Sequence, residues 1–333
     1  MELRLFNRLR NSVVQKSLVL MYHKIAEQEL DIWDLAVSPD RFEQQLQVLK
    51  KKTKIVSLQQ LMTTKSRFKN RVAITFDDGY MDNIKMAKPI LEKYQVPATF
   101  FVTSRHDQHE CEYWWDILEN CILNTENLPP VFMMFIEGKE FVFCLEEETY
   151  LTTEIFELHK QWKAYLEDPP TLRAKLYYEL WLLLKVLPFK EQKHYLKKIQ
   201  QWAQVADGLR ADYRTMSASD LELLANSSLF TIGSHTANHP SLAQHDAAFQ
   251  KREIVENRDY LEKIVGRKIQ FLAYPYGNCN NNTLAIARDV GFDAAFTTEE
   301  RTFDSSAVYS VGRFQVKNLT GGEFRNQLKN WLL

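Results

Sequence analysis

One stretch of the chain reads Val72-Ala73-Ile74-Thr75-Phe76-Asp77-Asp78-Gly79-Tyr80. Its first five residues are apolar or β-branched, which is typical of a buried strand, and its glycine indicates a turn directly after that strand. The strand therefore delivers two adjacent carboxylates, those of Asp77 and Asp78, to one end of a sheet. Neighbouring side chains of a strand point to different sides and like charges repel, so the pair is costly unless a metal or a proton separates their roles.

A second apolar segment, residues 230–233, runs into two histidines, His235 and His239. One aspartate and two histidines suggest a divalent metal, because catalytic zinc sites generally keep three protein ligands and leave a position for water or substrate. A bound metal would lower the pKa of its water from about 15.7 to roughly 7 and would polarise a carbonyl group. The other aspartate can then serve as general base. Taken alone, the two histidines are more simply explained as turn or capping residues, but the aspartate pair reverses that preference.

A third apolar segment ends in the turn Tyr274-Pro275-Tyr276-Gly277. Active-site loops of α/β proteins commonly follow such strands, so we expect the three turns to share one face of the fold. The motifs at 75–80, 235–240 and 274–276, in this order and separation, resemble those of the polysaccharide deacetylase family. Its members are metal-dependent carbohydrate esterases with a NodB-homology domain.

The resemblance implies a role for each matching residue. Asp77 is similar to the family's general base, whereas Asp78, His235 and His239 are similar to its metal ligands. Tyr276 would offer its backbone N–H to the oxyanion. Zinc is the expected metal, and Co²⁺, Ni²⁺ or Fe²⁺ would suit the same ligand types.

Two departures from the family pattern affect this expectation. Tyr274 stands where many members place an arginine that pairs with the catalytic base, and no histidine lies beyond residue 245 to act as general acid. Arg313 could stabilise developing charge, but an arginine is a poor proton donor because it stays protonated. His23 ends the apolar strand at 18–22 and is a better candidate for proton transfer or substrate contact. The alternative is a partly buried histidine that is hydrogen-bonded at a strand end.

Alternating strand and helix patterns predict an α/β fold, a distorted (β/α) barrel of about seven units that forms a single catalytic domain over residues 1–333. The predicted strands cover 17–22, 72–76, 98–102, 229–233, 269–273 and 293–297. The predicted helices follow Ser38, cover 84–94, follow Ser217 as far as Leu224, and cover 247–265 and 281–290.

Residues 111–214 break this alternation and are predicted to form an insertion between two barrel units. A hairpin is expected at 131–136 and 140–145, with amphipathic helices at 172–187 and 191–205. Trp114 and Trp115, which open the insertion, are either core residues or platforms that stack on sugar rings. An insertion at this place would restrict which substrates reach the metal.

Composition excludes several classes of protein. The 333 residues carry a net charge of -1, so no global basic field argues for nucleic-acid binding. Four cysteines without C-x-x-C spacing are expected to be free thiols, and no stretch approaches the roughly 20 apolar residues that span a bilayer. The first 16 residues form a basic amphipathic segment, either a weak anchor to anionic lipid or a helix that covers one end of the barrel. We expect a cytoplasmic enzyme, with peripheral contact to the inner membrane as the alternative.

The expected reaction is hydrolytic removal of an acetyl group from an N-acetylated amino sugar of a bacterial surface polysaccharide or its lipid-linked precursor. Two alternatives remain open from the residues alone. The same site would treat an O-acetyl ester or another non-peptide amide in much the same way. A catalytically silent glycan-binding protein is the third reading, since both departures concern catalytic groups.

Overall fold

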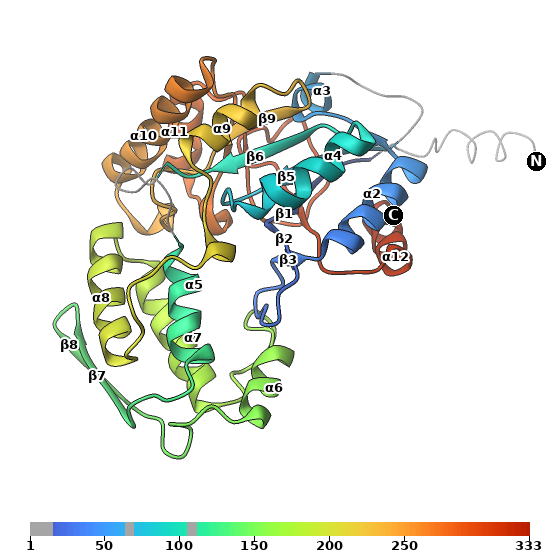
Figure 1. Ribbon diagram of the computed structural model, residues 1–333. Coiled ribbons are helices and arrows are strands. Elements are labelled where there is room, and N and C mark those ends of the chain that lie inside the picture. Colours follow the sequence, from blue (N-terminus) through green and yellow to red (C-terminus); the bar gives the residue numbers. More distant parts are fainter. Residues whose placement is uncertain (1–15, 64–69, 105–111) are drawn as a thin grey trace, which may run out of the picture.

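The computed structural model of the protein describes residues 16–63, 70–104 and 112–333. An eight-stranded sheet, in which all pairings are parallel, forms its centre (Figure 1). In spatial order the strands are β11 (Ala294–Phe296), β10 (Phe271–Ala273), β9 (Phe230–Ser234), β6 (Ala98–Val102), β5 (Arg71–Phe76), β1 (Ser17–Tyr22) and β12 (Phe314–Gln315), and β4 (Lys54–Ile55) pairs with β5. Each predicted strand is present with its ends within two residues of the prediction.

The segment between β11 and β12 links the two ends of this sheet. Val311 forms a parallel bridge with Phe296 of β11, and three residues later Phe314 pairs with Leu20 of β1. The Thr297 N–H donates to the Val311 carbonyl at 2.8 Å, so hydrogen bonds continue across the gap. This closure confirms the predicted distorted (β/α) barrel.

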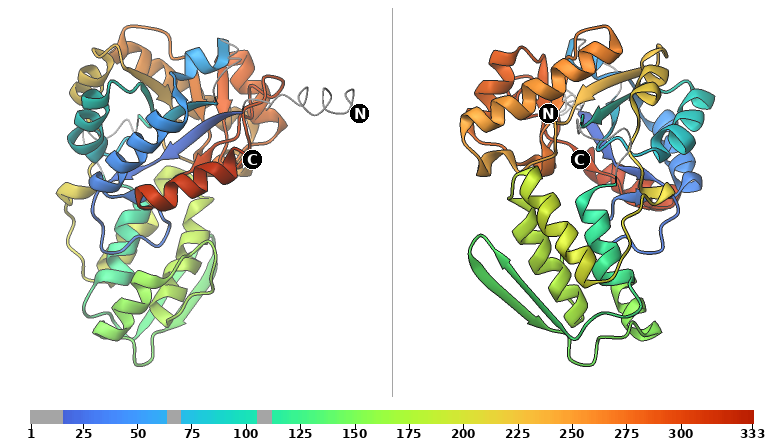
Figure 2. Two further views of the ribbon diagram at one scale, coloured as in Figure 1. Left: turned by 90° about the vertical axis from the view of Figure 1, so that its right-hand side faces the viewer. Right: turned by 60° about the vertical axis from the view of Figure 1, so that its left-hand side comes forward.

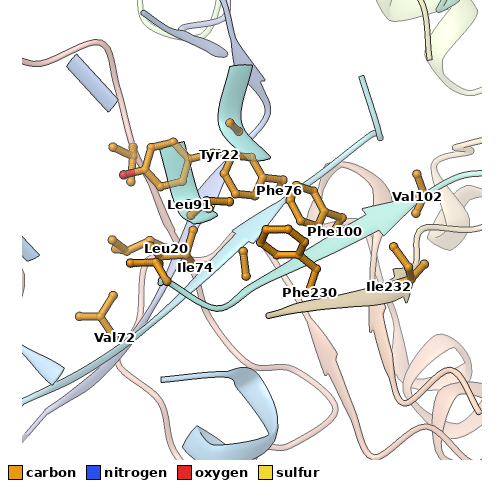
Figure 3. Packing of buried hydrophobic residues seen from close by; sticks show 14 of the residues in the cluster. Leu20, Tyr22, Val72, Ile74, Phe76, Leu91, Phe100, Val102, Phe230 and Ile232 are labelled. Atoms are coloured by element: carbon orange, nitrogen blue, oxygen red, sulfur yellow. The ribbon is translucent and has the colours of Figure 1, made fainter. Parts of the chain in front are cut away.

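A row of aromatic rings crosses the sheet and forms much of its core (Figure 3). Tyr22 stacks on Phe76 at 5.4 Å between ring centroids, and Phe76 stacks on Phe100 at 4.9 Å. The edge of Phe230 then meets Phe100 at 5.5 Å. Because the four residues come from four neighbouring strands, this packing fixes the strands that carry the candidate site relative to one another.

Helices cover the outside of the barrel, and their ends follow local sequence signals. Ser38 accepts a hydrogen bond from the Arg41 N–H and Pro39 occupies the first turn, so α2 (Pro39–Lys52) begins where predicted. The predicted helix over 84–94 instead begins with the π-helical turn η1 (Asn83–Ala87) before α4 (Lys88–Tyr94). The remaining barrel helices are α3 (Leu58–Thr63), α9 (Ala218–Ala225), α10 (Ala247–Val265), α11 (Asn281–Val290) and α12 (Gly321–Trp331).

The insertion forms a lobe on one side of the barrel (Figures 1 and 2). It consists of α5 (Trp114–Glu119) with its π-helical extension η2 (Asn120–Asn124), the hairpin β7 (Val131–Ile136) and β8 (Lys139–Cys144), α6 (Thr153–Gln161), α7 (Leu172–Lys185) and α8 (Phe189–Trp202). The hairpin, α7 and α8 lie where they were predicted, but only α8 is clearly amphipathic, because the apolar residues of α7 lie nearly all around it. The helices α5 and α6 were not predicted. Both missed helices are shorter than ten residues, so they show little periodicity.

A buried ion pair joins the lobe to the barrel. Nζ of Lys24, in β2 (Lys24–Ile25), lies 2.9 Å from Oδ1 of Asp116 in α5, and the two side chains are only 4% and 6% exposed. The Tyr80 hydroxyl donates to the other carboxylate oxygen of Asp116 at 2.8 Å. Each buried charge therefore has a partner, which is the condition for burying it.

Lys24→Met is expected to lower the free energy of unfolding by about 3–5 kcal/mol, because it leaves the Asp116 carboxylate buried and uncompensated. Chemical denaturation followed by circular dichroism measures the loss. Lys268→Met is the matched control, since Lys268 pairs with Asp293 at 3.0 Å with the lysine side chain 59% exposed, and exposed pairs contribute about 0–1 kcal/mol. Equal effects of the two substitutions would contradict the role given to burial.

The predicted N-terminal amphipathic segment lies almost entirely outside the described residues, which begin at Lys16. Among the helices that are described, none combines the length and apolar character needed to cross a membrane. Cys121, Cys144 and Cys279 are free thiols, as predicted, and Cys111 lies outside the described residues.

Candidate active site

Asp77 and Asp78 lie directly after β5, at its carboxyl end. The Asp77 N–H donates to the Tyr22 carbonyl of β1 at 2.9 Å, which extends the sheet by one residue. The backbone then turns through Asp78 with φ 71° and Gly79 with φ 76°. A Cβ atom on Gly79 would lie 2.0 Å from Cγ1 of Val102, so only glycine fits there. The turn leaves both carboxylates buried.

The three predicted turns come together, and each carries strained backbone. Left-handed φ angles occur at four of their non-glycine residues, namely 71° at Asp78, 65° at Thr236, 59° at His239 and 57° at Tyr276. Each such residue costs about 1–3 kcal/mol, and such strain concentrates at functional sites, where the surrounding structure holds it in place. The turns therefore define one candidate site at the carboxyl edge of the barrel.

Asp78, His235 and His239 form a compact buried cluster. The Asp78 Oδ1 lies 3.4 Å from Nε2 of His235 and 3.3 Å from Nε2 of His239, and the three candidate ligand atoms lie within 4.8 Å of one another. Metal–ligand bonds of about 2.1 Å place neighbouring tetrahedral ligands about 3.4 Å apart. The spacing of these atoms therefore suits one divalent ion, which is the kind of site that the sequence predicted.

Residues behind the cluster fix the orientation of His235. Its Nδ1 lies 2.8 Å from the Ala273 carbonyl of β10, so Nδ1 carries the hydrogen and Nε2 is free to coordinate. Asn257 of α10 accepts the His235 N–H at 3.1 Å. The neighbouring His239 is buried, and burial lowers its pKa to about 4 despite Asp78. A neutral imidazole is the form that binds a metal.

Arg313 is the buried partner of Asp77. Its Nη1 and Nη2 donate to the two carboxylate oxygens of Asp77 at 2.7 and 2.6 Å, and its Nε donates to the Thr297 carbonyl at 3.0 Å. Burial raises the pKa of Asp77, but the guanidinium and the nearby His235 outweigh it and hold that pKa below its usual value. Asp77 is therefore ionised and rigidly held at neutral pH.

This pairing resolves the departure at Tyr274. The Tyr274 hydroxyl donates to the Tyr309 carbonyl at 3.0 Å, and the Tyr274 ring belongs to the core. Tyr274 therefore does not take the place of an arginine that pairs with Asp77. Arg313 takes the place that the sequence left open for a partner of Asp77. Stabilisation of developing charge was the role considered for Arg313, and its contact with Asp77 was not predicted.

Arg313→Met is expected to move the acid limb of the kcat/KM–pH profile upward by about one to three pH units, since loss of an adjacent cation raises a carboxyl pKa by that amount. Arg313→Lys keeps the charge but not the two parallel hydrogen bonds, so a smaller shift is expected. Thermal unfolding should accompany the assay, because the change also leaves Asp77 buried without its partner. An acid limb that does not move in Arg313→Met would contradict the assignment.

His23 and Tyr276 both line the same cavity as the cluster. Nδ1 of His23 is buried without a hydrogen-bond partner among the described residues, so the strand-end hydrogen bond considered as its alternative is not formed at that atom. Burial lowers the pKa of His23. The ring of Tyr276 packs edge-on against His239 at 4.5 Å between centroids. Their roles as proton donor and oxyanion donor stay predictions.

The cavity has a volume of about 310 Å³, and elements outside the barrel form much of its wall. The insertion contributes Trp115, Tyr165, Trp181 and Lys185, and the loop between β2 and β3 (Ala36–Val37) contributes Trp33. Sequence reasoning considered only Trp115 of these five. Its indole N–H donates to the Tyr80 hydroxyl at 2.9 Å and the residue is 7% exposed, so it is at once a core residue and part of the wall.

The site combines an Asp/His/His cluster with a separate aspartate that an arginine holds, at the carboxyl edge of a (β/α) barrel. This arrangement suits metal-assisted hydrolysis. Residues 64–124 and 197–295 match the family model described as polysaccharide deacetylase, and the interval between them lies in the insertion. The chain belongs to the polysaccharide deacetylase family, a family of metal-dependent deacetylases.

A curated relative is YxkH of Bacillus subtilis (strain 168), provisionally described as a polysaccharide deacetylase. It is 34% identical over 97 residues, which cover 28% of this chain and 33% of YxkH. The matched region thus spans about a third of that relative's length.

Solved structures of deacetylases share the fold. The Streptococcus pyogenes deacetylase PplD in complex with acetate has a TM-score of 0.51 and 21% identity, covering 94% of this chain and 97% of that one. IcaB from Ammonifex degensii has a TM-score of 0.55 and 18% identity, covering 96% and 97%. A de-N-acetylase from Aggregatibacter actinomycetemcomitans has a TM-score of 0.55 and 16% identity, covering 95% and 100%.

Proposed function

We propose that the protein hydrolyses the acetamido group of an N-acetylated amino sugar in a bacterial surface polysaccharide or its lipid-linked precursor. The observation that carries the proposal is the placement of two carboxylates with different partners in one cavity. Asp78 faces two imidazoles, whereas Asp77 is held by a guanidinium. Membership of a deacetylase family supports the reaction, and the likeness to the de-N-acetylase from Aggregatibacter actinomycetemcomitans supports the amide over the ester.

Asp78, His235 and His239 would hold the metal, and zinc is the ion we propose. When bound, such an ion lowers the pKa of a water molecule to near 7 and polarises the substrate carbonyl. The donor set fits this use, because Oδ1 of Asp78 is buried without a conventional hydrogen bond and faces Nε2 of both histidines.

Asp77 is the proposed general base. Its ionised carboxylate accepts the proton of the attacking water, and the hydrogen bonds from Arg313 keep both of its oxygens in fixed positions during the transfer. Since Arg313 cannot give up a proton, it orients Asp77 without competing for that proton.

Two further groups complete the proposed mechanism. The backbone N–H of Tyr276 would stabilise the negative charge that develops on the carbonyl oxygen of the acetyl group, an interaction that can contribute on the order of 10²-fold or more to the rate. Departure of the amine needs a proton. Asp77 can return the proton it has taken, and His23 lines the same cavity and is the second candidate donor.

The test is acetate release together with the appearance of free amine on fully N-acetylated chito-oligosaccharides, compared with an O-acetylated, N-unsubstituted glycan. Acetate with equimolar amine from the first substrate supports the proposal. Acetate only from the second would support the O-acetyl esterase. Tight binding of both glycans by metal-loaded protein without any acetate would favour the silent binder.

A further inference from the structure

Lys185 is the last residue of α7 and faces the cavity. It lies four residues after Trp181, so both side chains project from the same side of the helix, and both line the cavity. Its Nζ is 4.5 Å from the centroid of the Trp181 ring and 4.5 Å from that of Tyr276. Because the Tyr276 centroid is 4.5 Å from that of His239, the ammonium lies no more than about 9 Å from the imidazole of a candidate metal ligand.

This ammonium has no carboxylate partner in the described part of the chain. Burial lowers the pKa of Lys185, and no acidic group opposes that effect. The two acids of the cavity wall are engaged elsewhere, Asp77 with Arg313 and Asp78 with the histidine pair. The aromatic faces on which Nζ rests, and the carbonyl groups at the end of α7, favour its charged form.

A carboxylate just outside the cavity is also compensated. Asp34 accepts a hydrogen bond from the hydroxyl of Tyr165, which lines the cavity. It pairs with Lys163 at 2.7 Å and with Lys317 at 3.3 Å, and its pKa is lowered because these hydrogen bonds outweigh burial. Asp34 therefore pairs with two lysines of its own and is not the partner of Lys185.

The charges around the cavity consequently leave a positive excess. The positive charge of Arg313 neutralises the negative charge of Asp77, and a divalent ion would leave one positive charge after neutralising Asp78. The Lys185 ammonium adds a further positive charge. A cavity with walls of low polarity strengthens such a field, and three wall positions near Lys185 are aromatic, those of Trp33, Trp181 and Tyr276. Trp33 stacks on Trp181 at 4.5 Å, so this side of the wall is rigid.

We propose that Lys185 binds an anionic oxygen group of the substrate, a carboxylate or a phosphate carried by the acetylated sugar or by the unit linked to it. This inference rests on the proposed function and narrows its substrate class from acetylated glycans to acidic ones. The insertion thereby supplies the specificity-determining residue, while the barrel supplies the reacting groups. The alternative is a purely structural role, in which the contact between the ammonium and the Tyr276 ring only stabilises the packing of α7 against Tyr276.

The experiment compares wild-type protein, Lys185→Met and Lys185→Arg, all loaded with zinc, on three acetylated substrates. These are neutral chito-oligosaccharide, an oligosaccharide of alternating N-acetylglucosamine and glucuronate, and a nucleoside diphosphate N-acetylglucosamine. Lys175→Met is the matched control, because Lys175 is exposed on the same helix, about 15 Å away along its axis, and does not line the cavity.

Wild-type protein is expected to show a higher kcat/KM on one of the acidic substrates than on the neutral one, and added salt should reduce this preference. The ratio should fall about tenfold or more in Lys185→Met, which is the effect of losing one charge-assisted hydrogen bond. Lys185→Arg and Lys175→Met should retain the preference. A preference for the glucuronate-containing oligosaccharide would identify a carboxylate as the recognised group, and a preference for the nucleoside diphosphate sugar would identify a phosphate.

An equal loss of kcat/KM on neutral and acidic substrates in Lys185→Met would show that Lys185 has only a structural role and would overturn the inference. Absence of acetate from every substrate with wild-type protein would instead overturn the proposed function. In that case calorimetric binding of the same sugars decides about Lys185. Tighter binding of an acidic sugar that is lost in Lys185→Met supports the inference, and equal binding by both proteins contradicts it.

Discussion

Asp77→Asn is expected to lower turnover by about 10²- to 10⁴-fold, the range for loss of a general base, while the protein keeps one divalent ion per chain. The amide has nearly the shape of the carboxylate but cannot take a proton from water. Since Asp78, His235 and His239 are unchanged, the proposed metal ligands keep their arrangement. Steady-state acetate release and elemental analysis on the same preparation measure the two quantities.

The control for this variant concerns folding. Asp77→Asn leaves the Arg313 guanidinium, which is fully buried, with one strong acceptor fewer, so some loss of stability is expected. Assays should therefore be run well below the melting temperature of the variant. Loss of metal in Asp77→Asn would contradict the assignment of Asp77 as general base and not as metal ligand. Unchanged turnover would show that Asp77 has no part in the mechanism.

Asp78→Ala is expected to lose metal and activity together. Removing one of three ligands weakens coordination directly, and it also leaves His235 and His239 facing each other without the carboxylate between them. Two imidazoles alone bind a divalent ion far more weakly than a set of three ligands. Equilibrium dialysis against zinc, followed by acetate release at saturating zinc, separates weak binding from lost chemistry.

His239→Ala should behave in the same way as Asp78→Ala. His245→Ala is a matched control, because His245 comes from the same region of the chain but is neither a member of the cluster nor part of the cavity wall. Full activity and metal content in His239→Ala would contradict the ligand assignment.

Local sequence signals were sufficient to predict the framework of this site. The run from Val72 to Gly79 contains a buried strand, two acids and a turn, all within eight residues. The spacing of His235 and His239 is equally local, whereas the choice of Asp78 as the third expected ligand came from the resemblance to the deacetylase family. Their cluster, within 4.8 Å, then follows from the parallel strands that end at the same edge.

The partner of Asp77 could not be predicted in the same way. Arg313 lies 236 residues further along the chain, and it reaches Asp77 only because the segment before β12 closes the barrel. The strand β12, and the strands β2 and β3 on either side of the loop at Trp33, are each two residues long, which is too short to show a period of two. The absence of the expected histidine from the C-terminal segment was therefore noted, but the contact of Arg313 in this segment with Asp77 was not predicted.

The remaining cavity wall was missed for a related reason. Trp181 and Lys185 belong to a helix whose apolar residues lie nearly all around it, so its sequence does not single out one side as facing the site. Which residues of the insertion reach the cavity depends on how the lobe packs against the barrel through contacts such as Lys24 with Asp116. Local sequence patterns do not reveal such contacts, because they join residues that are far apart in the chain.

The most direct test of the central claim is the metal content of protein purified without chelator, paired with acetate release from N-acetylated oligosaccharides before metal removal, after removal and after add-back. We predict one divalent ion per chain in wild type, loss of acetate release on removal, and recovery on add-back of zinc. Protein that binds no divalent metal, or that releases acetate equally well without one, would contradict the account.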